Sequence, residues 1–263
     1  MKNIIKLFID IFGIFFGKLT EPKTEEKNLS PLPEPKKDLN TNPEIEVIEN
    51  LLSSWTPEKK DEFIKQSDNQ IIFVETQYNW QLNNTKYKNL SPASQCGYTS
   101  AGIFLSHWIP NIDDNYIDRM VNELDKDYLI DKTKTRQGAY QNTYSKYFKN
   151  KLPDFKIITR PHSGTREEIL EALKNGSPVF TSTMITTHGH YIVITGFNYQ
   201  KSSYIVQDPF GFFDFDLDRY TNTKEFSGKE VLYRADQLEA KLEASSKLFG
   251  KTGYRYIFAK KEL

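Results

Sequence analysis

The sequence is poor in cysteine, and this narrows the chemistry open to it. Cys96 is the only cysteine among 263 residues. A single thiol cannot form an intrachain disulfide, and it cannot build the thiolate clusters that hold structural zinc. Cys96 is therefore either packed in the interior as a small apolar side chain or used as a reactive group.

The chain also lacks an excess of charge of either sign. Lys and Arg number 35, as do Asp and Glu, so the formal net charge is zero. No overall field favours an anionic surface, and we expect no nucleic-acid partner. Aromatic residues make up 14% of the chain, which favours a folded core with β-sheet over disorder. The length predicts one folded domain plus an appendage, and no internal repeat is found.

Residues 1–19 are mostly apolar, with one narrow polar stripe formed by Lys6, Asp10, Gly13 and Gly17. As a helix, this segment falls just short of the ~30 Å hydrocarbon core, and Asp10 near its middle would cost about 2.5–3.5 kcal/mol. No small-residue cleavage signature follows. We expect an uncleaved anchor or interfacial helix, and hence a location at the cell envelope or membrane. The alternative is a cytoplasmic chain in which this helix packs on protein.

Residues 20–45 combine several prolines with charges and have almost no large apolar side chains. Such a segment cannot bury enough area to fold, which predicts a flexible linker. Sequence typical of a globular protein begins near Glu46, so residues 46–263 are the predicted folded domain.

Within residues 46–263, predicted helices precede predicted strands, which indicates an α+β domain with a helical part packed on a mostly antiparallel sheet. The pattern predicts helices in EIEVIENLLSSW, from Thr56, from Cys96, in NYIDRMVNELDKDYLI and at 137–149. Residues 71–80 are expected to be extended. Strands are predicted from FKIITR onward, in SPVFTSTMI, HYIVITGFNY, SYIVQD, KEVLYR and GYRYIFAK, with helices in TREEILEALKNG and at 235–248. Thr165 and Glu168 form a capping box at the start of the first of these helices, and Gly176 marks its end.

Cys96 opens a predicted helix after the loop sequence SPASQ. The unsatisfied N–H groups and the positive end of the helix dipole would face its sulfur and favour the thiolate, which is the reactive form. Inert packing remains the alternative for any single cysteine.

His190 begins the strand HYIVITG, where it could act as a general base held by a rigid backbone. His188 lies two residues earlier, which raises the alternative of a metal pair, but no nearby Cys or acidic cluster supplies further ligands. We therefore expect neither metal nor cofactor.

Asp208 ends the next predicted strand, before Pro209. A hairpin through NYQKSS would return Asp208 to the side of His190, where a carboxylate fixes the imidazole tautomer. The alternative is that Asp208 is a turn residue only.

Cleavage of an acyl compound also requires hydrogen-bond donors for the oxyanion, and a side-chain amide near the nucleophile could supply one. Gln77, Gln81 and Gln95 are the candidates. We favour Gln81, because its loop could fold back over the helix start, whereas the side chain of Gln95 can point away from Cys96.

Four motifs, WQLNN, QCGYTSAGIFLSHW, GHYIVITGF and VQDPFG, together resemble the bacteriocin-processing peptidases that act on double-glycine leaders, in particular their stand-alone bacterial and phage branch. They span residues 77–211. The resemblance implies a papain-like cysteine protease fold, a catalytic triad of Cys96, His190 and Asp208, and Gln81 at the oxyanion. The chain departs from the family in two ways: Asn83 stands where Asp is common, and the loop at 84–95 is long.

These patterns predict a cysteine hydrolase, either a peptidase or an amidase, that cleaves amide bonds through a thioester. The expected partner is a peptide substrate, and an anchor with a tether favours peptidoglycan or other envelope peptides. Two alternatives stay open: a non-catalytic peptide-binding module of the same fold, and a protein-deamidating effector or toxin. The sequence does not indicate an oligomeric state.

Overall fold

The computed structural model describes residues 71–86, 90–127 and 138–261. The predicted apolar helix at 1–19, the predicted linker at 20–45 and the helices predicted before residue 71 lie outside this part of the chain. Among the helices that are described, none is both long and apolar enough to cross a membrane.

The described residues form an antiparallel sheet of seven strands. Six of them follow one another in the order β2 (Phe155–Gly164), β9 (Tyr254–Lys261), β3 (Val179–Thr183), β4 (His190–Asn198), β5 (Ser203–Gln207) and β8 (Val231–Arg234). The seventh, β1 (Ile71–Phe73), pairs with the end of β4 that β3 leaves free. Every strand predicted from FKIITR onward is present, and the predicted α+β class is confirmed.

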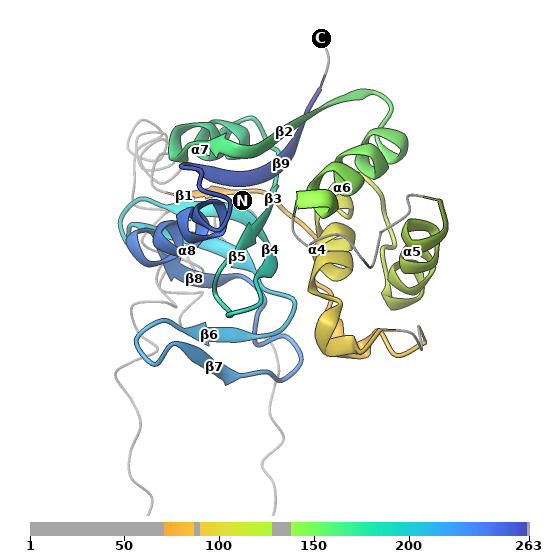
Figure 1. Ribbon diagram of the computed structural model, residues 1–263, viewed down its shortest axis with the longest axis horizontal. Helices are drawn as coiled ribbons and strands as arrows, with labels where there is room; N and C mark the ends of the chain where they lie inside the picture. The colour runs from red at the N-terminus through yellow and green to blue at the C-terminus, as the bar shows by residue number, and fades with distance from the viewer. Residues whose placement is uncertain (1–70, 87–89, 128–137, 262–263) are drawn as a thin grey trace, which may run out of the picture. The chain divides into compact units, whose positions relative to one another are not determined.

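Helices cover both faces of this sheet, as Figure 1 shows. One face carries α4 (Cys96–Leu105), α5 (Asp114–Asp127) and α6 (Gly138–Lys151), and the other carries α7 (Arg166–Lys174) and α8 (Ala235–Lys247). Neighbouring strand residues alternate between the two cores, as a pleated strand requires. Phe180 and Val193 enter the first core, whereas Val179 and Ile192 enter the second.

Helix α4 is the central element of its layer, and every residue after Cys96 in it is buried. Small residues let its neighbours approach closely. A side chain at Gly102 would place its Cβ 2.8 Å from Ile117 Cγ1 on α5. A helix that is buried on all sides cannot shift without opening the core. The position of Cys96, the first residue of this helix, is therefore fixed.

Two elements are shorter than the sequence indicates. Helix α4 ends at Leu105 instead of continuing toward Pro110, and the Ser106 hydroxyl donates to the Ile103 carbonyl in the last turn. Strand β1 ends at Phe73, and one further backbone bond joins the Val74 N–H to the Thr195 carbonyl. The backbone N–H of Gln77 then bonds to Ser106 Oγ, 2.7 Å away. The chain thus leaves the sheet to reach the helical layer.

A separate two-stranded hairpin, β6 (Phe212–Asp214) and β7 (Arg219–Asn222), lies between β5 and β8 in the sequence. The sequence prediction contained only a turn after Asp208. The alternation of Phe213 and Phe215 with Asp214 is a period-two strand signal that could have indicated the hairpin.

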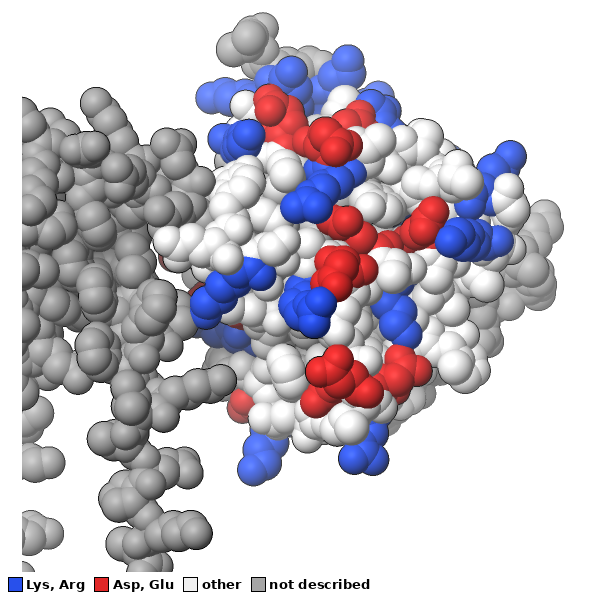
Figure 2. All heavy atoms as spheres, turned by 90° about the vertical axis from the view of Figure 1, so that its left-hand side faces the viewer, with Lys and Arg blue, Asp and Glu red and all other residues white. Residues whose placement is uncertain are grey.

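The described surface mixes charges of both signs. Figure 2 shows Lys and Arg side chains interspersed with Asp and Glu over the visible face. Ion pairs such as Lys241 with Asp218 and Lys247 with Glu243 involve α8. This agrees with the zero net charge, and it offers no single-sign patch on that face that would attract a polyanion.

The N-cap half of the capping box predicted for α7 is present, while the Thr165 backbone N–H bonds to the Tyr256 hydroxyl at 3.0 Å. Thr165 is the N-cap, and its hydroxyl accepts a hydrogen bond from the Glu168 backbone N–H at 3.3 Å. We expect Thr165→Ala to lower the free energy of unfolding by about 1 kcal/mol, because one N–H at the helix start loses its acceptor. Urea denaturation measures this loss. Thr165→Ser is the control and should keep most of the stability, so equal losses in both variants would contradict the role of the hydroxyl.

Candidate active site

His190 and Asp208 meet at the open end of the β4–β5 hairpin. His190 is the first residue of β4, and Asp208 follows the last residue of β5. The register pairs Val193 with Gln207, which brings the two side chains together. His190 Nε2 lies 2.8 Å from Asp208 Oδ1. The histidine is 5% exposed and the aspartate 0% exposed, so water does not compete for this hydrogen bond.

Cys96 begins α4 and is partly exposed, unlike the rest of its helix. One turn further on, Ser100 Oγ donates to the Tyr191 carbonyl at 2.9 Å. This bond fastens α4 to the strand residue that follows His190. The backbone N–H of Tyr191 also acts to lower the pKa of the Cys96 thiol. Because Asp208 holds Nε2 of His190, Nδ1 is the ring nitrogen left to exchange a proton with Cys96.

The charges at the site favour a thiolate beside an imidazolium. Burial raises the pKa of the Cys96 thiol, but the charge of His190, a hydrogen bond with it and the Tyr191 N–H together lower that pKa below its ordinary value. Burial also acts against a charged His190, yet Asp208 and Cys96 outweigh it and raise the pKa of the imidazole. The two shifts have opposite signs, which is what an ion pair produces.

The Asp208 carboxylate accepts hydrogen bonds at both oxygens. Oδ1 receives the Phe210 backbone N–H at 3.0 Å in addition to His190. Oδ2 receives the hydroxyls of Tyr220 and Tyr233, each at 3.0 Å. Burial, followed by the charge of Asp208, raises the pKa of both phenols well above the usual value, so they stay protonated and can donate. A buried carboxylate in this setting is fully paired.

The sequence prediction missed both tyrosines. Tyr233 belongs to the predicted strand KEVLYR, but nothing in that pattern indicates which group its hydroxyl meets. Tyr220 lies in the hairpin that was not predicted. The one available signal was that hairpin's period-two pattern, which could have indicated the hairpin without locating Tyr220 or its contact.

The backbone of Asp208 is held as firmly as its side chain. The Asp208 N–H donates to the Gly228 carbonyl at 2.8 Å. The Asp208 carbonyl accepts a hydrogen bond from Tyr78 Oη at 3.0 Å. A Cβ at Gly228 would lie 1.9 Å from that carbonyl oxygen, so glycine is needed for the loop to pass. The orienting carboxylate is therefore fixed from several sides.

The three candidate glutamines occupy different positions. Gln81 lies in the turn η1 (Gln81–Asn83), which folds back so that Nε2 donates to Pro92 O at 3.1 Å, leaving one amide hydrogen for another acceptor. Gln95 donates both amide hydrogens, to the carbonyls of Asn84 and Leu90. Gln77 is tied to Ser106 at the far end of α4, roughly 15 Å along the helix from Cys96. Gln95 thus has no amide hydrogen left for an oxyanion, and Gln81 stays the predicted donor.

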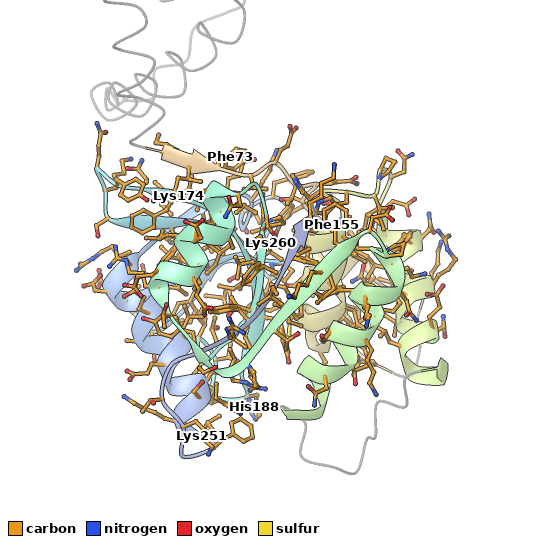
Figure 3. All side chains as sticks on the ribbon, turned by 90° about the horizontal axis from the view of Figure 1, so that it is seen from above. Phe73, Phe155, Lys174, His188, Lys251 and Lys260 are labelled. Atoms are coloured by element: carbon orange, nitrogen blue, oxygen red, sulfur yellow. The ribbon has the colours of Figure 1, made fainter. Side chains whose placement is uncertain are left out.

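The other histidines stand apart from this group. His188 is exposed in the turn before β4, with Nδ1 3.1 Å from Thr187 Oγ1, and lies at the periphery of the molecule in Figure 3. His107 contacts the Glu75 carbonyl at 2.9 Å, and the ring of His162 packs on Phe249. Within the described residues, no group of three or more His, Cys, Asp or Glu side chains is arranged to hold a metal ion.

The family comparison points to the same segments. A model described as the Peptidase_C39 like family matches residues 72–235, which is more than half of the chain. Gln81, Cys96, His190 and Asp208 all lie within the match. A search of curated proteins found no match.

The ion pair predicts how alkylation of Cys96 depends on pH. We expect iodoacetamide to label the wild type with a midpoint below the ordinary thiol value of about 8.5, because His190 lowers the thiol pKa. His190→Ala removes that stabilisation and leaves burial in place, so the midpoint should rise. Mass spectrometry of the labelled peptide over a pH series measures both. Equal midpoints in the two proteins would show that His190 does not stabilise the thiolate.

Proposed function

We propose that this chain, which belongs to the Peptidase_C39 like family, is a cysteine hydrolase that cleaves amide bonds with Cys96 as nucleophile, His190 as general base and acid, and Asp208 as orienting residue. The observation that carries the proposal is the buried His190–Asp208 hydrogen bond beside a thiol of lowered pKa. A thiolate at neutral pH is the form that attacks a carbonyl, and an inert buried cysteine would have no such shift.

In the first half of the reaction, the Cys96 thiolate attacks the carbonyl carbon of the scissile amide and a C–S bond forms. The protonated His190 gives its proton to the leaving nitrogen as the C–N bond breaks. The amine departs and leaves a thioester on Cys96. Asp208 keeps the imidazole in the tautomer and orientation that this transfer needs.

In the second half, a water molecule attacks the thioester while His190 takes one of its protons. The C–S bond breaks, the carboxylic acid product leaves and the thiolate is restored. In both halves a negative charge develops on the carbonyl oxygen. The remaining amide hydrogen of Gln81 and the backbone N–H of Cys96 are the donors proposed to stabilise it.

The proposed substrates are peptides of the cell envelope, among them peptidoglycan stem peptides. The support comes from the sequence alone: an apolar segment at 1–19 followed by a linker at 20–45 would let a tethered domain act on a nearby layer. This assignment is separable from the reaction itself, since Cys-His-Asp chemistry serves many acyl substrates.

Cys96→Ala tests the reaction. Incubated with a mixed peptide library and with purified sacculi, the wild type should release new amino termini, and the variant should lose this activity by on the order of a thousandfold or more. Mass spectrometry of the products identifies the cleaved bonds. Peptide cleavage without release from sacculi would contradict only the envelope substrate. Binding without cleavage would indicate a binding module, and a one-unit mass gain on glutamine side chains would indicate a deamidase.

The two glutamines allow a matched test of the oxyanion donor. We expect Gln81→Ala to lower kcat by about 10²- to 10³-fold with little change in KM, because the donor acts on charge formed in the transition state. Gln95→Ala should instead lower thermal stability, because two backbone carbonyls lose their donor, and should affect kcat less. Steady-state kinetics and thermal unfolding measure both variants. A larger kcat loss in Gln95→Ala would reverse the assignment.

A further inference from the structure

We infer that Tyr220 and Tyr233 are positioning residues of this reaction, whose hydroxyls hold Oδ2 of Asp208 so that Oδ1 stays directed at His190. This inference rests on the proposed function. It adds two residues that the motif pattern does not contain, and their hydroxyls donate to Asp208 and not to the thiol.

The first argument is that both oxygens of the Asp208 carboxylate are occupied by hydrogen-bond donors. A carboxylate can turn about its Cβ–Cγ bond, since this torsion has no sharp staggered minima. Two donors at each oxygen remove that freedom: His190 and the Phe210 N–H at Oδ1, and the two phenols at Oδ2. Without the phenols, Oδ2 of this fully buried carboxylate would lose both of its donors, which is costly.

The second argument is the direction of the Tyr233 hydroxyl. Its oxygen accepts the Phe213 backbone N–H at 3.1 Å, so its single hydrogen is free to donate. Asp208 Oδ2 lies at 3.0 Å and the Gly211 carbonyl at 3.5 Å, which favours the carboxylate. Tyr233 is 1% exposed on β8 of the main sheet and has little room to turn away.

The third argument concerns Tyr220, which comes from the separate β6–β7 hairpin. Its ring meets the imidazole of His190 in a T-shaped contact with centroids 5.8 Å apart, and Phe210 packs on it in turn at 4.8 Å. Tyr220 therefore contacts both partners of the orienting hydrogen bond. The hydroxyl restrains the carboxylate and the ring restrains the imidazole.

The titratable groups around the His190–Asp208 pair determine how a pH profile of the site is interpreted. They are Cys96 on α4, Tyr220 on β7, Tyr233 on β8 and Tyr78 before η1. The charge of Asp208 contributes to the raised pKa of Tyr78 as well. Burial raises the pKa of all three phenols, so they remain neutral donors across the assay range. A change in the pH profile of a Tyr→Phe variant then reports on Cys96 and His190 and not on titration of the tyrosine.

The experiment compares Tyr220→Phe, Tyr233→Phe and the double variant with Tyr204→Phe. Tyr204 is the matched control: it is fully buried, pairs directly with Tyr233 in the β5–β8 ladder, and donates to Glu239 Oε1 at 2.8 Å away from the site. Each single variant loses one hydroxyl bonded to a carboxylate, and the double variant loses two. The readouts are kcat and KM on a cleaved peptide, the pH midpoint of Cys96 alkylation by iodoacetamide, and the thermal midpoint.

We expect kcat to fall severalfold in each single site variant and about tenfold or more in the double variant, with KM unchanged. The alkylation midpoint should move to higher pH, because a poorly oriented His190 stabilises the thiolate less. Tyr204→Phe should lose thermal stability and keep the kcat and alkylation midpoint of the wild type. If the site variants behave like Tyr204→Phe, their hydroxyls are structural only and the inference is wrong.

Failure of the proposed function gives a different result. If the wild type cleaves no peptide but shows a lowered alkylation midpoint, the hydrolase assignment fails, and the shift of that midpoint still decides the role of the tyrosines. The single variants keep the test decisive if the double variant does not fold.

Discussion

The arrangement of the site depends on one buried charge. The Asp208 carboxylate is 0% exposed, and an ion in that position is tolerated only when donors surround it. These donors come from the start of β4, the turn after β5, the hairpin strand β7 and the sheet strand β8. Satisfying this carboxylate therefore brings four segments together, and the orientation of His190 follows from it. The same contacts that stabilise the fold give the imidazole its direction.

The thiol reaches the imidazole through a different set of contacts. Cys96 belongs to the helical layer, whereas His190 and Asp208 belong to the sheet, so the ion pair forms only where the two layers meet. The Ser100 hydroxyl and the Tyr191 backbone join them within one helical turn of the sulfur. A shift between the layers would separate thiolate from imidazolium and return each pKa toward its ordinary value. Close packing around α4 prevents such a shift.

The sequence predicted the features that depend on local patterns. Short sequence patterns were enough to predict the helix starting at Cys96, the hairpin joining His190 to Asp208 and the cap at Thr165. The sequence could rank Gln81 above Gln95 only from an expected loop geometry, because no pattern identifies the two carbonyls that accept both amide hydrogens of Gln95. The phenols on Asp208 were out of reach for the same reason. Their contacts span 12 and 25 residues without a fixed spacing, and they depend on how a hairpin sits over the sheet.

The family match leaves out a strand that supports the site. The match ends at residue 235, at the first residue of α8, yet β9 lies between β2 and β3 in the sheet. Ile257 and Tyr256 of β9 are fully buried, one in each core, and both pair with β3. Strand β3 in turn pairs with β4 as far as Thr183 opposite His190. The strand that presents the histidine is thus supported by a segment outside the match. Residues at the site are restricted by their specific polar contacts, whereas a supporting strand needs only burial and a pleat, which many sequences provide.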